Sequence, residues 1–200
     1  MSTFNKKYLH QITVSEKADR INESLSWAVR SQLKSRDSVE ITLFKLAEWV
    51  AVPATREIMI NPMLQEHLQR TFLAHGYCEL YAVRLDNEEF PVYILPVTLE
   101  AIDEFRRKMG AFCYALFTGD VEPDWVLIAI ESELYVIAGP SEFVCQFLDC
   151  KIEEAFSRFQ NFVIHEPMPQ QLRKYLHLVY DRLKDNYQSA VVGTEFRLSP

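Results

Sequence analysis

Apolar residues recur every three to four positions along the first third of the chain, which is the spacing of one buried face of an α-helix. The first such run covers residues 18–33, and Thr13 with Glu16 before it forms a capping box. The run over residues 62–75 has the same spacing. We therefore expect residues 1–76 to form a helical N-terminal segment.

Residues 38–60 outline a helix, a break at Pro53 and a second helix. With the helix before it and the strands after it, this order matches a winged helix-turn-helix, which is a DNA-binding unit. In this alternative, Thr55 and Arg56 reach base edges from the second helix. Glu57 beside them would be repelled by phosphates, and three short helices also pack in this order without binding DNA. DNA binding is therefore an alternative and not the preferred interpretation.

The pattern changes at Tyr77, where β-branched and aromatic residues begin to alternate with others. The apolar runs and the turns between them predict strands over residues 77–85, 90–95, 111–118, 125–130, 134–138 and 191–196. Helical spacing returns over residues 98–109, 140–148, 152–162 and 172–183. The run at 111–118 is apolar on both faces, so we expect it at the centre of the sheet.

These elements predict an α+β fold: an antiparallel five- to six-stranded sheet covered by helices over residues 77–200, preceded by the helical segment, with a boundary near Gly76. The short connections favour antiparallel pairing. From residue 77 to residue 148, the element order resembles that of profilin-like, longin-like and GAF-like domains. That resemblance implies a fold only, because such folds host sensing, scaffolding and catalysis alike.

The composition is that of an ordinary globular protein, with 48% hydrophobic and 24% charged residues among 200. The net charge of −7 is uneven, because residues 1–76 hold ten Lys and Arg against eight Asp and Glu, whereas residues 77–200 hold eleven against twenty. An acidic surface disfavours a chain-wide grip on nucleic acid or on an anionic membrane. No secretory leader or membrane-spanning run stands out, and the four cysteines form no disulfide pattern, so we expect a cytoplasmic protein that does not bind membranes.

The densest group of carboxylates is a predicted loop that holds Asp120, Glu122 and Asp124. Alternate carboxylates in a loop can bind Mg²⁺ or Ca²⁺. The pair Pro123-Asp124, followed by Glu131-Ser132-Glu133, resembles the core of restriction-type nucleases, except that a glutamate stands where that core has its lysine. A metal-dependent enzyme that uses residues 120–124 is therefore a second alternative, although we expect the loop to bind no metal.

The remaining residues that carry chemistry form no recognisable set. No two histidines stand four residues apart, which leaves zinc without a ligand pattern; they are His10, His67, His75, His165 and His177. Cys113 lies in an apolar run where a thiol is inert, whereas Cys78 is the cysteine that we expect to be exposed. The chain has no glycine-rich phosphate loop and no serine elbow.

We therefore expect no catalytic residue, no bound metal and no cofactor. The preferred interpretation is a non-catalytic regulatory or interaction protein that binds a protein partner or a small ligand. The sequence indicates neither the partner, nor the ligand, nor the oligomeric state.

Overall fold

The computed structural model shows an α+β protein with two antiparallel sheets. It describes residues 10–12, 15–35, 38–44, 48–55, 62–86, 91–109, 113–119, 121–130, 134–188 and 195–198. Six helices and ten strands lie within these residues. None of these described helices is long and apolar enough to cross a membrane.

The main sheet has seven strands in the order β1-β6-β5-β7-β8-β9-β4, and each strand is antiparallel to its neighbours. Its strands are β1 (His10–Gln11), β4 (Trp49–Thr55), β5 (Glu79–Arg84), β6 (Val92–Pro96), β7 (Tyr114–Thr118), β8 (Trp125–Ile130) and β9 (Leu134–Pro140). The sheet is thus larger than the predicted five or six strands. The expected central position of residues 111–118 is confirmed for the described part, because β7 is the fourth of the seven strands.

The additional strands come from the predicted helical segment. β1 and β4 precede Gly76 in the chain, yet they pair with β6 and β9 from after it. The predicted boundary near Gly76 stays a prediction, but the main sheet draws strands from both sides of it.

The helical prediction is wrong for the described residues between 29 and 55, which form β4 of the main sheet and two strands of a second sheet. Helix α1 (Ser15–Ser26) ends early, and β2 (Val29–Ser35) and β3 (Ser38–Phe44) form a hairpin that β10 (Glu195–Leu198) extends. The physical reason is visible in β3, where Val39, Ile41 and Leu43 alternate with polar residues at the period of a strand. Ile41 and Leu43 are fully buried on one face of this sheet.

The helix-turn-helix outline over residues 38–60 is wrong for the same reason, because its described parts are β3 and β4. Thr55 is the last residue of β4 and lies opposite Leu134 of β9. Arg56 lies outside the described residues. The alternative of a DNA-reading helix therefore loses the helices on which it rested.

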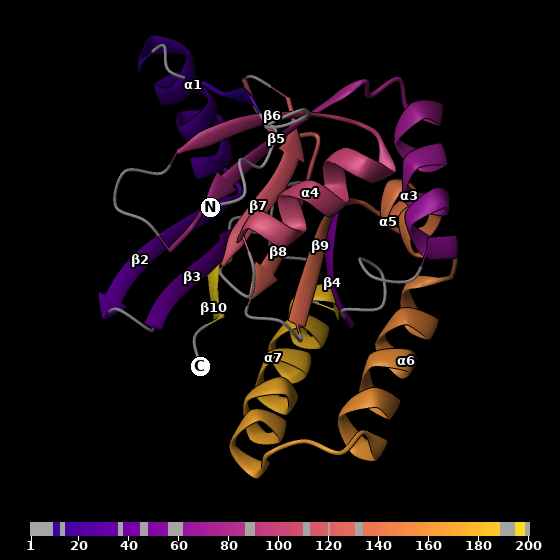
Figure 1. The fold of residues 1–200 in the computed structure, drawn as a ribbon. Coiled ribbons are helices and arrows are strands. Elements are labelled where there is room, and N and C mark those ends of the chain that lie inside the picture. Colours follow the sequence, from indigo (N-terminus) through magenta and orange to yellow (C-terminus); the bar gives the residue numbers. More distant parts are fainter. Residues whose placement is uncertain are drawn as a thin grey trace, which may run out of the picture.

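Three helices cover one face of the main sheet (Figure 1). They are α3 (Pro62–Ala74), α4 (Leu99–Met109) and α5 (Ser141–Leu148). Trp125 of β8 stacks on Phe72 of α3 and Phe143 of α5, and Phe105 of α4 meets Tyr114 of β7 edge-on at 5.0 Å. Alternate residues of a strand share a face, and Tyr114 lies opposite Ala129. These contacts therefore place α3, α4 and α5 on the same side.

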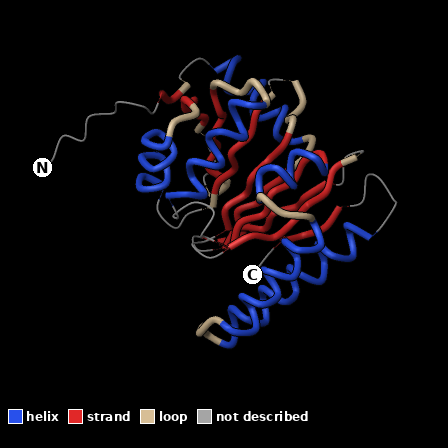
Figure 2. The backbone as a smooth tube through the Cα atoms, turned by 90° about the vertical axis from the view of Figure 1, so that its right-hand side faces the viewer, coloured by secondary structure: helices blue, strands red, loops and turns tan. Residues whose placement is uncertain are grey.

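The last two helices form an antiparallel pair at the β4 end of the sheet. They are α6 (Ile152–His165) and α7 (Gln170–Gln188), and both contact β4. Figures 1 and 2 show the pair projecting beyond the strands. Arg173 fixes the turn between them, because its guanidinium donates hydrogen bonds to the carbonyl oxygens of Val163 (2.6 Å), Ile164 (2.5 Å) and Glu166 (2.9 Å). These carbonyls at the end of α6 would otherwise lack partners within the helix.

Candidate functional site

A groove with a volume of about 470 Å³ lies between the edge strand β4 and the helices α3, α5 and α6. We call it the β4–α6 groove. Its lining residues are Pro53, Ala54, Thr55, Leu68, Phe147, Leu148, Cys150, Ala155, Arg158, Phe159, Asn161, Phe162, His165 and Glu166. Its volume lies within the range of small-molecule sites, which is roughly 300–1,000 Å³.

The groove forms where β4, α3, α5 and α6 meet, because a proline and an alanine at this point leave space unfilled. β4 is an edge strand, so Pro53, which has no N–H to donate, is tolerated there. On α6, the inward stripe places Ala155 one turn before Phe159. A methyl group fills less of the space between helix and strand than the rings around it, so the stripe leaves a hollow beside Ala155.

The inside of the groove is apolar and firmly packed. Leu68, Phe147 and Phe159 are each at most 2% exposed, and they come from α3, α5 and α6 respectively. Phe147 also packs against Phe72 and Phe143, so the floor is continuous with the core of the sheet. Such a floor is held in one shape by its surroundings, and the groove is therefore a feature of the fold and not of one mobile side chain.

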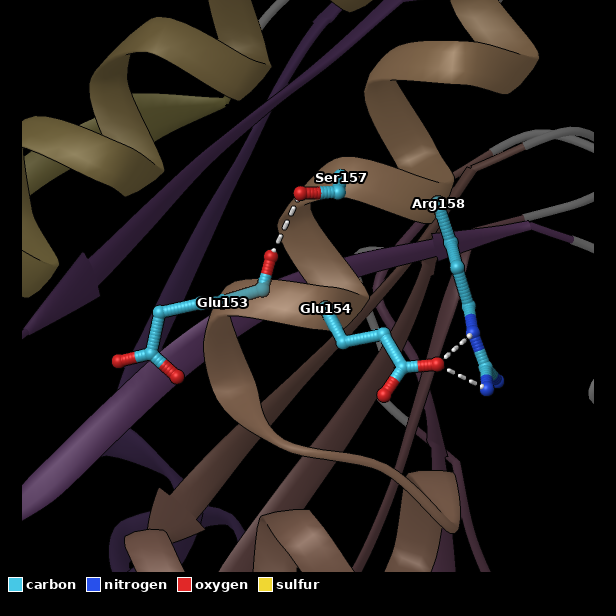
Figure 3. Close-up of polar contacts among 4 residues, drawn as sticks. All are labelled: Glu153, Glu154, Ser157 and Arg158. Carbon is cyan, nitrogen blue, oxygen red and sulfur yellow. Dashed lines mark hydrogen bonds and ion pairs between the residues drawn. The ribbon is translucent and has the colours of Figure 1, made fainter.

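Polar side chains stand at the rim, along the outer part of α6. Arg158 donates hydrogen bonds from Nη2 (2.6 Å) and Nε (3.1 Å) to Glu154 Oε1, one helical turn earlier. Figure 3 shows the two side chains next to each other on α6, with Ser157 Oγ turned back to the carbonyl oxygen of Glu153. The Arg158 and Glu154 side chains are 60% and 53% exposed. An ion pair this exposed contributes about 0–1 kcal/mol, so either partner can exchange it for another at little cost.

One thiol lies in the wall of the groove, where α5 leads into α6. Burial raises the pKa of the half-buried Cys150 thiol, and the nearby Arg158 guanidinium offsets only part of that effect. A raised pKa keeps the group as a neutral thiol near neutral pH, and the neutral form is a poor nucleophile. The groove therefore contains a cysteine that is not activated for covalent chemistry.

The predicted acidic loop is only partly described, because Asp120 lies outside the described residues. Asp124 accepts a hydrogen bond from Thr118 Oγ1 (3.0 Å), and it also hydrogen bonds with Tyr77. Within the described part of the chain, no three His, Cys, Asp or Glu side chains are placed to hold a metal ion. The expectation that the loop binds no metal stays a prediction.

Of the five histidines, His10 lies in β1 and His177 in α7. His67 of α3 and His75, which follows α3, attach that helix to α5: His67 Nε2 donates to the Gln146 carbonyl oxygen (2.6 Å), and His75 Nε2 donates to Gln146 Oε1 (2.7 Å). His165 instead stands at the groove rim. Cys113 is buried and Cys78 is exposed, as predicted.

Sequence reasoning found one groove residue, Thr55, for a different reason, since it was expected on a DNA-reading helix and it ends an edge strand. The other groove residues gave no signal. Pro53 is the exception among them, because a proline inside a run of β-forming residues indicates an edge strand, which has no neighbouring strand on one side.

No protein-family model matches the chain, and no curated protein or solved structure is significantly similar to it.

Proposed function

We propose that this chain is a non-catalytic, cytoplasmic binding protein whose β4–α6 groove takes a small ligand with an apolar body and an anionic end. The observation that carries the proposal is the groove itself. It has the volume of a small-molecule site, apolar side chains inside and polar side chains at the rim. A regulatory role would follow if the bound and free forms differ in affinity for a partner.

The floor supports the apolar body of the ligand. The half-buried Leu148 and Phe162 offer apolar surface beside a floor that is already packed, so little ordering is needed when a ligand covers it. Each ligand methylene buried there contributes about 0.8 kcal/mol. A ligand without an apolar body would gain nothing from this part of the groove.

Arg158 supports the anionic end. It is the one lysine or arginine among the described residues that line the groove. Its present partner, Glu154, is more than half exposed, so the existing ion pair is weak. A carboxylate or sulfonate at the partly desolvated rim can accept two hydrogen bonds from the guanidinium.

The Cys150 thiol supports the non-catalytic part of the proposal. It is the strongest potential nucleophile lining the groove, and its pKa is raised by burial instead of lowered. Catalytic cysteines have the opposite shift. The thiol that lines the groove is therefore not activated for nucleophilic chemistry, which favours a binding role.

Two fluorescent probes with one skeleton test this proposal. 1-Anilinonaphthalene-8-sulfonate is apolar with an anionic end, and N-phenyl-1-naphthylamine lacks the sulfonate. Both should bind saturably with a rise in fluorescence. Arg158→Gln should weaken the sulfonated probe by about fivefold, which corresponds to about 1 kcal/mol, and leave the neutral probe unchanged.

A variant that fills the mouth of the groove tests whether the probes bind there. Asn161 is exposed at the rim, so Asn161→Trp should fill the mouth of the groove without disturbing the core and should abolish binding of both probes. Ile164→Trp puts the same ring on an exposed position of α6 outside the groove, and it should bind both probes as the wild type does. Equal binding by Asn161→Trp and wild type would overturn the proposal.

A further inference from the structure

A second hollow of about 400 Å³ lies where β4 begins, next to the end of α3 and the start of α5. We call it the aromatic pocket. Four rings line it: Trp49 from β4, His75 and Tyr77 from the segment that follows α3, and Phe143 from α5. It shares no lining residue with the β4–α6 groove, so it is a separate site.

Two of the rings are nearly parallel, and a third is steeply inclined to both. The His75 and Tyr77 rings are nearly parallel, with an interplanar angle of 11° and centroids 6.0 Å apart. The Phe143 ring is tilted by 77° to each of them, at 5.1 Å from His75 and 6.2 Å from Tyr77. Because Phe143 is 3% exposed and stacks on Trp125, the ring surface open to an occupant comes mainly from Trp49, His75 and Tyr77. The face of an aromatic ring carries partial negative charge and attracts cations.

The charged side chains of the pocket have one sign. Glu122, Asp124 and Glu142 line it, and no lysine or arginine is among its described lining residues. All three carboxylates belong to exposed residues. A positively charged occupant would therefore be attracted by these side chains and meet no opposing cation among them.

Hydrogen bonds and ring stacking fix the side chains that line the pocket. His75 Nε2 donates to Gln146 Oε1 (2.7 Å), and Gln146 Nε2 donates to Glu142 Oε1 (3.4 Å), which links a ring of one wall to a carboxylate of the rim. Phe143 stacks on the buried Trp125 at 5.2 Å. Burial, and then the Asp124 carboxylate, raise the pKa of Tyr77, so its phenol stays neutral near neutral pH. A site whose walls are already in place costs little to organise on binding.

From these walls and charges we infer that the aromatic pocket binds a quaternary ammonium group. Such a cation is weakly hydrated and has apolar methyl groups, so it can lie on ring faces while carboxylates at the rim balance its charge. A divalent metal ion does not fit this chemistry, because it requires several converging oxygen ligands, and no such group of side chains occurs among the described residues. A purely apolar ligand would gain no attraction from the three carboxylates, two of which, Asp124 and Glu142, already accept hydrogen bonds within the protein.

Choline and its neutral isostere test the inference. In 3,3-dimethyl-1-butanol a carbon replaces the nitrogen of choline, so size and shape are kept and the charge is lost. Calorimetric titration at constant ionic strength should give saturable choline binding, with a Kd on the order of 1–10 mM. The isostere should not bind in that range. Equal binding of the two compounds, or no choline binding up to about 100 mM, would overturn the inference.

Matched variants locate the site. Trp49→Leu removes one ring and should raise the choline Kd about two- to fivefold. Trp27→Leu is its control, because Trp27 is 57% exposed and lies outside the pocket. Glu142→Gln should raise the Kd about two- to fivefold as well. Its control is Glu100→Gln, which removes an exposed acid from the first turn of α4 as Glu142→Gln does from α5. Wild-type affinity in both pocket variants would refute this location.

The same group can come from a free metabolite or from a trimethylated lysine of a partner protein. A short peptide that carries trimethyl-lysine separates these sources when its Kd is compared with that of choline. Tighter binding of the peptide, lost in Trp49→Leu, would identify a partner side chain. Equal or weaker binding would identify a free small molecule. Failure of both ligands would overturn the inference and leave the β4–α6 groove proposal unaffected.

Discussion

The two hollows of this protein lie on the same two elements and have opposite chemistry. β4 supplies Trp49 to the aromatic pocket at its start and Pro53 to the β4–α6 groove four residues later. α5 supplies Phe143 to the pocket and Phe147 to the groove, again four residues apart. The pocket combines rings with carboxylates, whereas the groove combines apolar walls with an arginine at the rim. One edge strand and one short helix thus contribute to two hollows for which we propose ligands of opposite charge.

The comparison teaches that packing at the sheet edge decides the kind of site that forms. Near Trp49, the ends of α3 and α5 bring rings together above the buried Trp125. At the other end of β4, α6 approaches with Ala155 in its stripe and leaves an apolar hollow. Phe147 belongs to both arrangements, because it lines the groove and also packs against Phe143 and Trp125.

The largest expected effect comes from removing that shared ring. Phe147→Ala deletes a side chain that is 2% exposed, and it should lower the free energy of unfolding by about 3–5 kcal/mol. Urea denaturation measures this loss, and both hollows should lose their ligands together. Leu178→Ala is the control, because Leu178 is 43% exposed on α7 and its truncation should cost under about 1 kcal/mol. A Phe147→Ala protein as stable as wild type would show that the two hollows have no common support.

A smaller change should separate the two hollows. A Cβ added at Gly139 of β9 would lie 2.9 Å from Trp125 Cβ and 3.6 Å from Phe143 Cδ1. Gly139→Ala should therefore displace the rings behind the aromatic pocket, at a cost of about 1–3 kcal/mol in stability. Titrations of the variant should show weaker choline binding and unchanged binding of N-phenyl-1-naphthylamine. Loss of both ligands would mean that the hollows deform as one unit.

The pH dependence of thiol modification tests the chemistry of the groove. Because folding raises the Cys150 pKa, the native thiolate should form at higher pH than the thiolate of the unfolded chain. By linkage, any stability gained from the neutral thiol is complete below the unfolded pKa and is lost as pH rises through the folded one. Iodoacetamide rates followed by peptide mass spectrometry should show the native profile displaced upward. Arg158→Gln should displace it further, since Arg158 favours the thiolate. A native profile at lower pH would argue for an activated cysteine.

The sequence predicts an element correctly where the pattern within that segment alone distinguishes a helix from a strand. The strands β7, β8 and β9 were predicted because their apolar runs allow no exposed face, and α6 and α7 because their stripes are long. The first helix was predicted to extend to residue 33 because Val29 and Leu33 continue the spacing of α1, and residues 38–60 were predicted as two further helices. The alternation in β3 was the competing signal, and pairing with β2 and β10 made it the stronger one.

The hollows could not be predicted in the same way. The walls of the aromatic pocket come from Trp49, Tyr77 and Phe143, which are separated by 28 or more positions and give no common pattern. Only the pairing of β4 with β9 brings the first of them beside the start of α5. Sites assembled by topology in this way become visible when the strand order is known.

The smallest expected effect concerns the ion pair at the groove rim. Glu154→Gln removes the partner of Arg158, and because both side chains are more than half exposed, the free energy of unfolding should change by less than about 0.5 kcal/mol. The freed guanidinium should then bind 1-anilinonaphthalene-8-sulfonate about twofold more tightly, since the probe no longer competes with a carboxylate. The neutral probe should be unaffected. Weaker sulfonate binding would mean that Glu154 orients Arg158 for the ligand instead of competing with it. The double variant with Arg158→Gln distinguishes these cases, because the effect of Glu154→Gln on the sulfonated probe should vanish when Arg158 is absent.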